Sequence, residues 1–276
     1  MKKLLNLRAR KFSQQIVLFP LLLILLASLS YYAPSQSEQV KVISTYPATV
    51  CPAVGNKVAS VASLSNSKIQ RRLINGISKT LNAGKKSLIV LNNDALLVEG
   101  NPGTALTFVN SGWKSVVPCS VSNGEQWFAG GSGALTSKSF LYIVNSGFSD
   151  SSVELQIYTP NGLIEPKSVV ISQNSTKKIS VDTLVPGEDK IVIGVKTLSG
   201  RVSSYLLDER KKGLKSLGAD FVAPVATANK KVTIAGISGL TGKQISNNNS
   251  ASHTLRLLIP GTIDANIDVT INSNDG

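Results

Sequence analysis

The chain has 276 residues, of which 42% are hydrophobic and 16% charged, and its formal net charge is +13 at pH 7. The basic residues do not cluster with aromatic residues, which argues against a nucleic-acid-binding protein. His253 is the single histidine, so a Ser-His-Asp or Cys-His site would have one available base, and no recognisable partner motif accompanies it.

The N-terminus has the pattern of a membrane-crossing segment. Residues 1–11 form a basic head without acidic residues, and residues 12–33 are uncharged, with an almost wholly apolar centre at residues 16–33. About 18 apolar residues are just enough to cross the hydrocarbon core of a bilayer. The positive head favours a cytoplasmic N-terminus. We therefore expect a transmembrane anchor that contacts the lipid bilayer through residues 16–33, in a single-pass cell-membrane protein whose bulk is extracytoplasmic.

A cleaved signal peptide is the alternative to a retained anchor. The sequence from Ser28 to Ser30 offers an acceptable cleavage site. Tyr31 and Tyr32, however, resemble interfacial aromatics at the outer headgroups, and the apolar span is long for a signal peptide. These features favour the anchor, and cleavage stays open.

The exported part is basic. The head supplies five of the thirteen excess charges, which leaves +8 for the remainder of the chain. An electropositive surface suits anionic lipid headgroups or an acidic cell-wall polymer, although solubility alone would explain the same excess. The expected partners are an anionic cell-wall polymer or another envelope protein.

Two cysteines occur, Cys51 and Cys119, and both lie in the exported part. Two thiols outside a cytoplasm normally pair, so a disulfide is expected. The alternatives are weaker, because a metal site lacks further ligands and a reactive thiol lacks a nearby histidine. We expect no metal site and no cofactor.

Residues 34–66 are expected to form an extracytoplasmic tether and the first strands, because they are rich in Ser, Thr, Val and Pro. Residues Ser67–Leu81 are a helix candidate, since apolar residues recur at helical spacing. Gly76 weakens that prediction, and a pair of strands is nearly as well supported.

From Lys85 onward, short apolar or alternating segments are separated by Asn, Gly, Pro and Ser, which is typical of antiparallel strands. The expected strands are Ser87–Leu91, Ala95–Val98, Ala105–Val109, Ser139–Val144, Val153–Tyr158, Ser168–Ile171, Lys178–Val181, Lys190–Val195, Val202–Leu207 and Lys231–Ala235. The sequence thus predicts a mainly β protein with an N-terminal transmembrane helix and immunoglobulin-like antiparallel β-sandwich modules.

An internal repeat indicates that the modules stand in tandem. Phe140–Asn145 and Val153–Ile157 are echoed by Thr254–Ile259 and Ile267–Ile271, about a hundred residues later, which is the size of one sandwich. We therefore expect one or more sandwich modules at residues 67–223.

The predicted second repeat module, at 224–276, is incomplete. Either the sequence is a fragment or another chain completes the sheet. We favour the fragment, because an uncovered strand edge and half a core would promote aggregation.

The candidate binding residues are one aromatic and a short basic run. Trp127 could be a sugar-stacking platform, whereas an aromatic at the start of a strand more often anchors a core. The densest charge run follows a strand that is expected to end near Leu207, and we expect it to be a solvated loop rather than a polyanion contact. Its basic residues are Arg210, Lys211, Lys212 and Lys215.

The exported part resembles a known family. The similarity rests on Pro118-Cys119, Glu125–Gly131, Phe140–Asn145, Val153–Gly162, Gly200-Arg201-Val202 and Gly218-Ala219-Asp220. These segments are similar to an actinobacterial family of membrane-anchored exoproteins that carries a domain of unknown function, and the family's early Cys-Pro corresponds to Cys51-Pro52. The resemblance implies a single anchor, β-rich extracytoplasmic repeats and a cell-envelope setting, with no catalytic residues to transfer. Members of that family generally continue through the second module.

These observations predict a non-catalytic scaffold or binding module of the cell envelope. The alternative is an accessory protein for envelope polysaccharide assembly, or a glycan-binding protein, near a membrane glycosyltransferase. A hydrolase of wall glycan is the least favoured interpretation, because the acidic residues are scattered and no pair stands out as a glycosidase couple.

Overall fold

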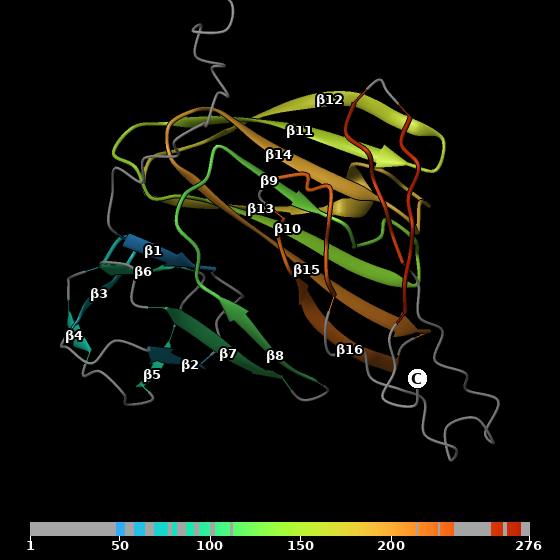
Figure 1. The fold of residues 1–276 in the computed structure, drawn as a ribbon. Coiled ribbons are helices and arrows are strands. Elements are labelled where there is room, and N and C mark those ends of the chain that lie inside the picture. Colours follow the sequence, from blue (N-terminus) through green and yellow to red (C-terminus); the bar gives the residue numbers. More distant parts are fainter. Residues whose placement is uncertain are drawn as a thin grey trace, which may run out of the picture. The chain divides into compact units, whose positions relative to one another are not determined.

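Figure 1 shows the computed structural model, which describes residues 48–52, 58–63, 69–76, 79–81, 87–90, 94–99, 103–110, 113–213, 215–225, 227–234, 255–261 and 264–271. The predicted cytoplasmic head at 1–11 and the predicted anchor at 12–33 lie outside these residues and stay predictions. Among the residues described, no helix is both long enough and apolar enough to span a membrane.

The described part of the chain is mainly β, as predicted, with antiparallel sheets and a single short 3₁₀ helix, η1 (Val181–Thr183). The strands before the middle of the chain are β1 (Ala48–Cys51), β2 (Val58–Ser63), β3 (Ile69–Leu73), β4 (Lys79–Leu81), β5 (Ser87–Val90), β6 (Leu96–Glu99), β7 (Thr104–Asn110) and β8 (Trp113–Pro118). The later strands are β9 (Glu125–Phe128), β10 (Ser137–Asn145), β11 (Ser151–Thr159), β12 (Gly162–Ile171), β13 (Ser175–Ser180), β14 (Val192–Ser199), β15 (Val202–Lys212) and β16 (Lys215–Val222).

The two sets of strands have the same topology. Strands β1 to β8, here the first sandwich, form sheets with the orders β1-β6-β3-β4 and β5-β2-β7-β8. Strands β9 to β16, here the second sandwich, form sheets with the orders β9-β14-β11-β12 and β13-β10-β15-β16. Adding eight to each strand number of the first sandwich therefore gives the second, which makes them two copies of one arrangement.

Alternation along the strands builds the core of the second sandwich. On β11, Val153, Leu155 and Ile157 are buried, and the residues between them are only half-buried. They pack with Leu141 of β10, Phe128 of β9 and further apolar side chains of both sheets in one cluster. The two sheets thus bury their apolar faces against each other, which defines a β-sandwich.

The helix candidate Ser67–Leu81 is wrong, and its alternative, a strand pair, agrees with the structure. Strand β3 pairs antiparallel with β4 and, on its other edge, with β6. Ile74 is buried in the turn that follows β3, where its N–H donates to the carbonyl of Ala95 at 2.8 Å. Pairing with β6 makes this segment a strand, and the spacing of apolar residues within the segment gives no information about that pairing.

Two further predictions need correction. The charge run after Leu207 is not a loop, because β15 continues to Lys212 and pairs with β16. The expected strand at Lys231–Ala235 is also wrong over residues 231–234, which carry no strand.

The repeated segments near the C-terminus differ from their counterparts in burial. Leu141 and Leu255, Ile143 and Leu257, and Val153 and Ile267 are separated by the same number of positions. The counterparts in the second sandwich are fully buried, whereas Leu255 is 48% exposed, Leu257 55% and Ile267 47%. The apolar pattern that builds a core in β10 and β11 is therefore about half-exposed at these positions of the described residues 255–261 and 264–271.

The predicted disulfide is present and links Cys51 to Cys119. Cys51 is the last residue of β1 and is fully buried, and Cys119 follows β8, so the bond joins the beginning and the end of the first sandwich. The two cysteines are 68 positions apart.

Replacing both cysteines by alanine, which leaves no unpaired thiol, should lower the free energy of unfolding by about 4 kcal/mol, because the disulfide closes a long loop in the unfolded chain. Urea unfolding with and without reductant measures this. Reductant should destabilise the wild type and leave the double variant unchanged, and equal midpoints for all four samples would contradict a structural role for the bond.

Candidate functional site

The hydroxyl of Tyr205 joins the two sandwiches. Tyr205 lies on β15 and is only 2% exposed. Its hydroxyl accepts from the backbone N–H of Ser120 at 3.0 Å, contacts Ser120 Oγ at 2.9 Å and donates to the carbonyl of Val50. Val50 and Ser120 also pair through their backbones, at 2.8 and 3.0 Å. These two residues are the neighbours of Cys51 and Cys119, so the disulfide and the tyrosine fix the same two chain segments.

The apolar residues around Tyr205 belong to one cluster that draws on both sandwiches. Tyr142 and Leu207 of the second sandwich share it with Leu106 and Phe108 of the first, and Cys51 lies in the same cluster. Burial raises the pKa of Tyr205 to about 12, because the phenolate would lose its hydration.

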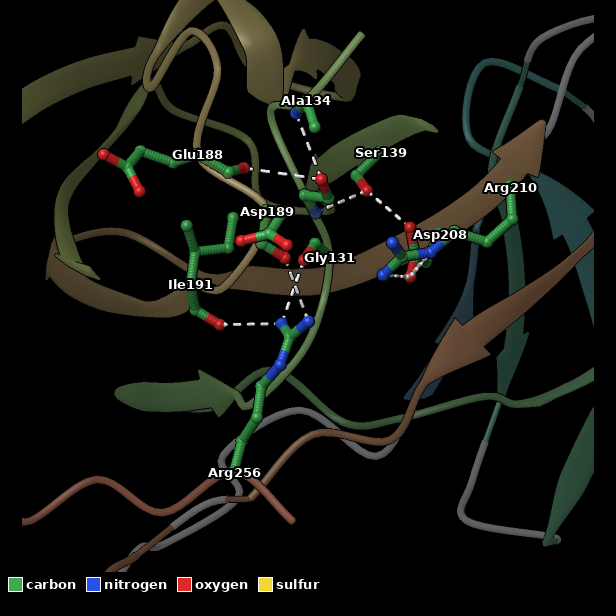
Figure 2. A network of polar contacts seen from close by, with 10 residues as sticks. Gly131, Ala134, Ser139, Glu188, Asp189, Ile191, Asp208, Arg210 and Arg256 are labelled. Atoms are coloured by element: carbon green, nitrogen blue, oxygen red, sulfur yellow. Dashed lines mark hydrogen bonds and ion pairs between the residues drawn. The ribbon is translucent and has the colours of Figure 1, made fainter. Parts of the chain in front are cut away.

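A polar network connects β10 and β15 of the second sandwich (Figure 2). Ser139 Oγ on β10 donates to Asp208 Oδ1 at 2.7 Å and accepts from the N–H of Ser132 at 2.9 Å. Arg210 donates from Nε and Nη2 to Asp208 Oδ2 at 3.0 and 2.8 Å. Both oxygens of Asp208 are therefore hydrogen-bonded within the protein.

Arg256 belongs to the same network and comes from the C-terminal segment. Its guanidinium donates to the backbone carbonyls of Gly131 at 2.9 Å, Ile191 at 3.2 Å and Asp189 at 3.0 Å, toward which it points in Figure 2. Burial lowers the pKa of Arg256, and the positive charge of Arg210 lowers it further. The three carbonyls attach residues 255–259 to the second sandwich.

An open pocket of about 400 Å³ lies over β15 and β16, between Asp208, Arg210, Asp220 and the apolar residues Leu217 and Phe221. Asp220 Oδ1 accepts from Ser115 Oγ of the first sandwich at 2.5 Å and from the N–H of Phe221 at 2.8 Å. The carboxylates that line the pocket thus already serve as hydrogen-bond acceptors of the fold. A general acid or base would need to exchange protons with a bound molecule instead.

The predicted basic run is brought onto the β15–β16 hairpin, but its charges are partly neutralised there. Arg210 pairs with Asp208 at 2.8 Å and Lys211 with Glu209 at 3.7 Å. Lys215 is exposed at the start of β16. The side chain of Lys212 lies outside the described residues. Because two of the cations have an acidic neighbour on the same strand, the hairpin is a weaker polyanion site than its sequence indicates.

Trp127 lies apart from this hairpin, on the other sheet. On β9, Gln126 and Phe128 are buried, whereas Glu125 is exposed and Trp127 is half-buried. Phe128 is therefore the core aromatic, and Trp127 belongs to the outer face. A Cβ at Gly194 would lie 2.7 Å from the indole, which therefore packs against β14 at this glycine. The ring of Tyr158 follows at 6.0 Å between centroids.

Tyr158 is absent from the predicted binding residues, although the alternation along β11 indicates that its side chain faces outward. Val153, Leu155 and Ile157 face the core, so Tyr158 must face outward. Its approach to Trp127 depends on the pairing of β14 with both strands.

Within the described residues, no group of three His, Cys, Asp or Glu side chains could hold a metal ion. Residues 114–276, more than half of the chain, match a family described as a family of unknown function (DUF5719). This match agrees with the predicted domain of unknown function. No curated protein matches the chain.

Replacing Tyr205 by phenylalanine should lower the free energy of unfolding at pH 7 by about 1–3 kcal/mol, because buried polar groups lose a partner. The folded pKa lies above the unfolded value of 10.0, so the wild-type contribution is complete below pH 10 and is lost as the pH rises toward 12. Urea unfolding at pH 7, 9 and 11.5 measures both effects.

The wild type should lose about 2 kcal/mol more than Tyr205→Phe between pH 9 and 11.5. Tyr158→Phe, on the outer face, is the matched control and should follow the wild type. Parallel pH profiles for wild type and Tyr205→Phe would show that the buried hydroxyl does not couple folding to pH.

Proposed function

We propose that this chain, which belongs to the family of unknown function DUF5719, is a non-catalytic scaffold or binding module of the cell envelope. The proposed setting is the outer side of the cell membrane, with the chain anchored through residues 16–33. The disulfide between Cys51 and Cys119 supports an oxidising compartment, where such bonds persist. The apolar N-terminal segment and its basic head support the anchor.

The observation that carries this proposal is the state of the carboxylates in the pocket over β15 and β16. Asp208 is hydrogen-bonded through both oxygens to Ser139 and Arg210, and Asp220 holds Ser115 of the first sandwich. A glycosidase needs two carboxylates that act on a bound sugar from opposite sides. These two connect strands to one another, which favours a structural role over hydrolysis.

The strand pairing supports tandem immunoglobulin-like modules as the finer description. The pairs β9–β14, β10–β15 and β15–β16 correspond to the B–E, C–F and F–G neighbours of immunoglobulin domains. The hairpin of β11 and β12 comes before β13, which departs from the immunoglobulin order. We infer that residues 224–276 begin one more copy, because their apolar pattern repeats β10 and β11.

The alternative is an accessory role in envelope polysaccharide assembly or glycan binding near a membrane glycosyltransferase. The outward-facing pair of Trp127 and Tyr158 favours it, because aromatic side chains present a large apolar surface at low conformational cost. The expected partners are an anionic cell-wall polymer, for which the positive charge of the exported part is suited, or another envelope protein.

The proposal is tested with the full chain in lipid nanodiscs, using empty nanodiscs as the control. Nanodiscs that carry the chain should retain purified cell-wall polysaccharide or, in a separate incubation with envelope protein and a cross-linker, should yield an adduct with that protein. No new reducing ends should appear in either case. Reducing ends released by the wild type and lost in Asp208→Asn would establish a hydrolase. The absence of both retained polymer and adduct would contradict a scaffold or binding role.

A further inference from the structure

The outer face of the β9-β14-β11-β12 sheet carries two aromatic rings over a single glycine. In the sheet, Trp127 of β9 pairs with Gly194 of β14, and Gly194 pairs with Gln156 of β11. A Cβ at position 194 would lie 2.7, 2.9 and 3.0 Å from Cζ3, Cη2 and Cε3 of the indole. The benzo ring of Trp127 therefore occupies the space that any other residue at 194 would fill with its side chain.

Tyr158 completes this surface from the opposite side of β14. It pairs with Val192, two residues before Gly194, and its ring is tilted by 47° to the indole. The rings thus come from β9 and β11 and converge over β14, the strand between them in Figure 1. We call Trp127, Tyr158 and Gly194 the aromatic shelf.

Planar hydrogen-bonding groups border the shelf. Gln156 Nε2 donates to Glu154 Oε1 at 2.8 Å, and both side chains are half-buried on the outer face of β11. Glu154 pairs across the sheet with Lys196, which in turn pairs with Glu125. An amide, two carboxylates and one ammonium group therefore lie in register beside two aromatic rings.

We propose that the aromatic shelf binds a neutral glycan, with a hexopyranose ring stacked on Trp127. A pyranose has an apolar C–H face that fits an aromatic ring and a rim of hydroxyl groups that both donate and accept hydrogen bonds. The shelf offers the same combination, an aromatic surface beside the amide of Gln156 and the carboxylate of Glu154. This inference rests on the proposed glycan-binding alternative, gives it a site, and names a neutral ligand in place of the anionic polymer that the net charge suggests.

The charges around the shelf select the neutral glycan over an acidic polymer. Glu125 and Glu154 flank Lys196, so the formal charge beside the shelf is negative, and it would repel a polyanion. The cations of the β15–β16 hairpin belong to the other sheet of the sandwich. Binding should therefore depend little on salt, unlike the attraction of an acidic polymer to a basic surface.

The test uses the full chain in nanodiscs and isothermal titration with neutral linear hexasaccharides of glucose, galactose and mannose. We expect at least one to bind, with an affinity that changes less than twofold between 50 and 500 mM NaCl. Trp127→Ala should weaken binding about tenfold or more, since buried aromatic anchors dominate small interfaces. Gly194→Ala should also weaken it, because the new Cβ displaces the indole.

Matched controls separate binding from folding. Phe148→Ala removes an exposed aromatic in the loop after β10 and should bind like the wild type. Tyr158→Phe keeps the ring and should retain binding, and the melting temperature of Trp127→Ala should stay close to that of the wild type. Unchanged affinity in Trp127→Ala, or no binding to any of the three hexasaccharides, would overturn the proposal.

Failure of the shelf and failure of the proposed function remain distinguishable. If Trp127→Ala retains wall polysaccharide or an envelope-protein adduct as well as the wild type does, the scaffold or binding role stands and the shelf is not its site. If retention of the wall polysaccharide disappears at 500 mM NaCl or in Lys215→Ala, that polymer is an acidic ligand of the basic hairpin, and the neutral-glycan inference is wrong.

Discussion

The hydroxyl of Tyr205 is the contact on which the two-sandwich arrangement depends. A hydroxyl buried without a partner is costly, and this one finds its partners in the backbone of Val50 and Ser120, on the other sandwich. Docking the sandwiches differently would leave the hydroxyl buried without these partners, whereas Val50 and Ser120 would still pair with each other through their backbones. The adjacent disulfide holds the same two segments together, so the N–H of Ser120 and the carbonyl of Val50 stay in place for the tyrosine.

This junction determines which surfaces can meet a partner. The outward side of β10 and β15 is occupied, because Tyr142, Tyr205 and Leu207 pack into the cluster shared with the first sandwich. On the outer side of the opposite sheet, Leu163 and Val170 are exposed, and Trp127 and Tyr158 are half-buried among the described residues. An aromatic pair on that sheet therefore keeps part of its surface for a ligand, whereas one on β10 or β15 would be part of the junction.

The charged side chains of Asp208 and Arg210 in the second sandwich bind to each other and to close neighbours. Asp208 lies in register with Ser139, and Arg210 follows it by two residues on the same face of β15, so one carboxylate satisfies two neighbours. Arg256 uses backbone carbonyls rather than a carboxylate. Two of the four cations in the basic run, Arg210 and Lys211, are thus paired within the fold, which shifts attention from polyanion binding to the aromatic face of the other sheet.

The sequence by itself determined the features that depend on local pattern and on composition. Alternation along Val153–Tyr158 predicted a strand with one buried face, and the count and compartment of the cysteines predicted the bond between Cys51 and Cys119. Tertiary pairing decided the rest. Ser67–Leu81 has helical spacing, but its described residues form β3 and β4, because β6 supplies hydrogen bonds from a later part of the chain. Trp127 and Phe128 are adjacent aromatics, and only the packing of two sheets decides which one enters the core. The shelf combines residues of β9, β11 and β14, and no single segment of the sequence contains all three strands.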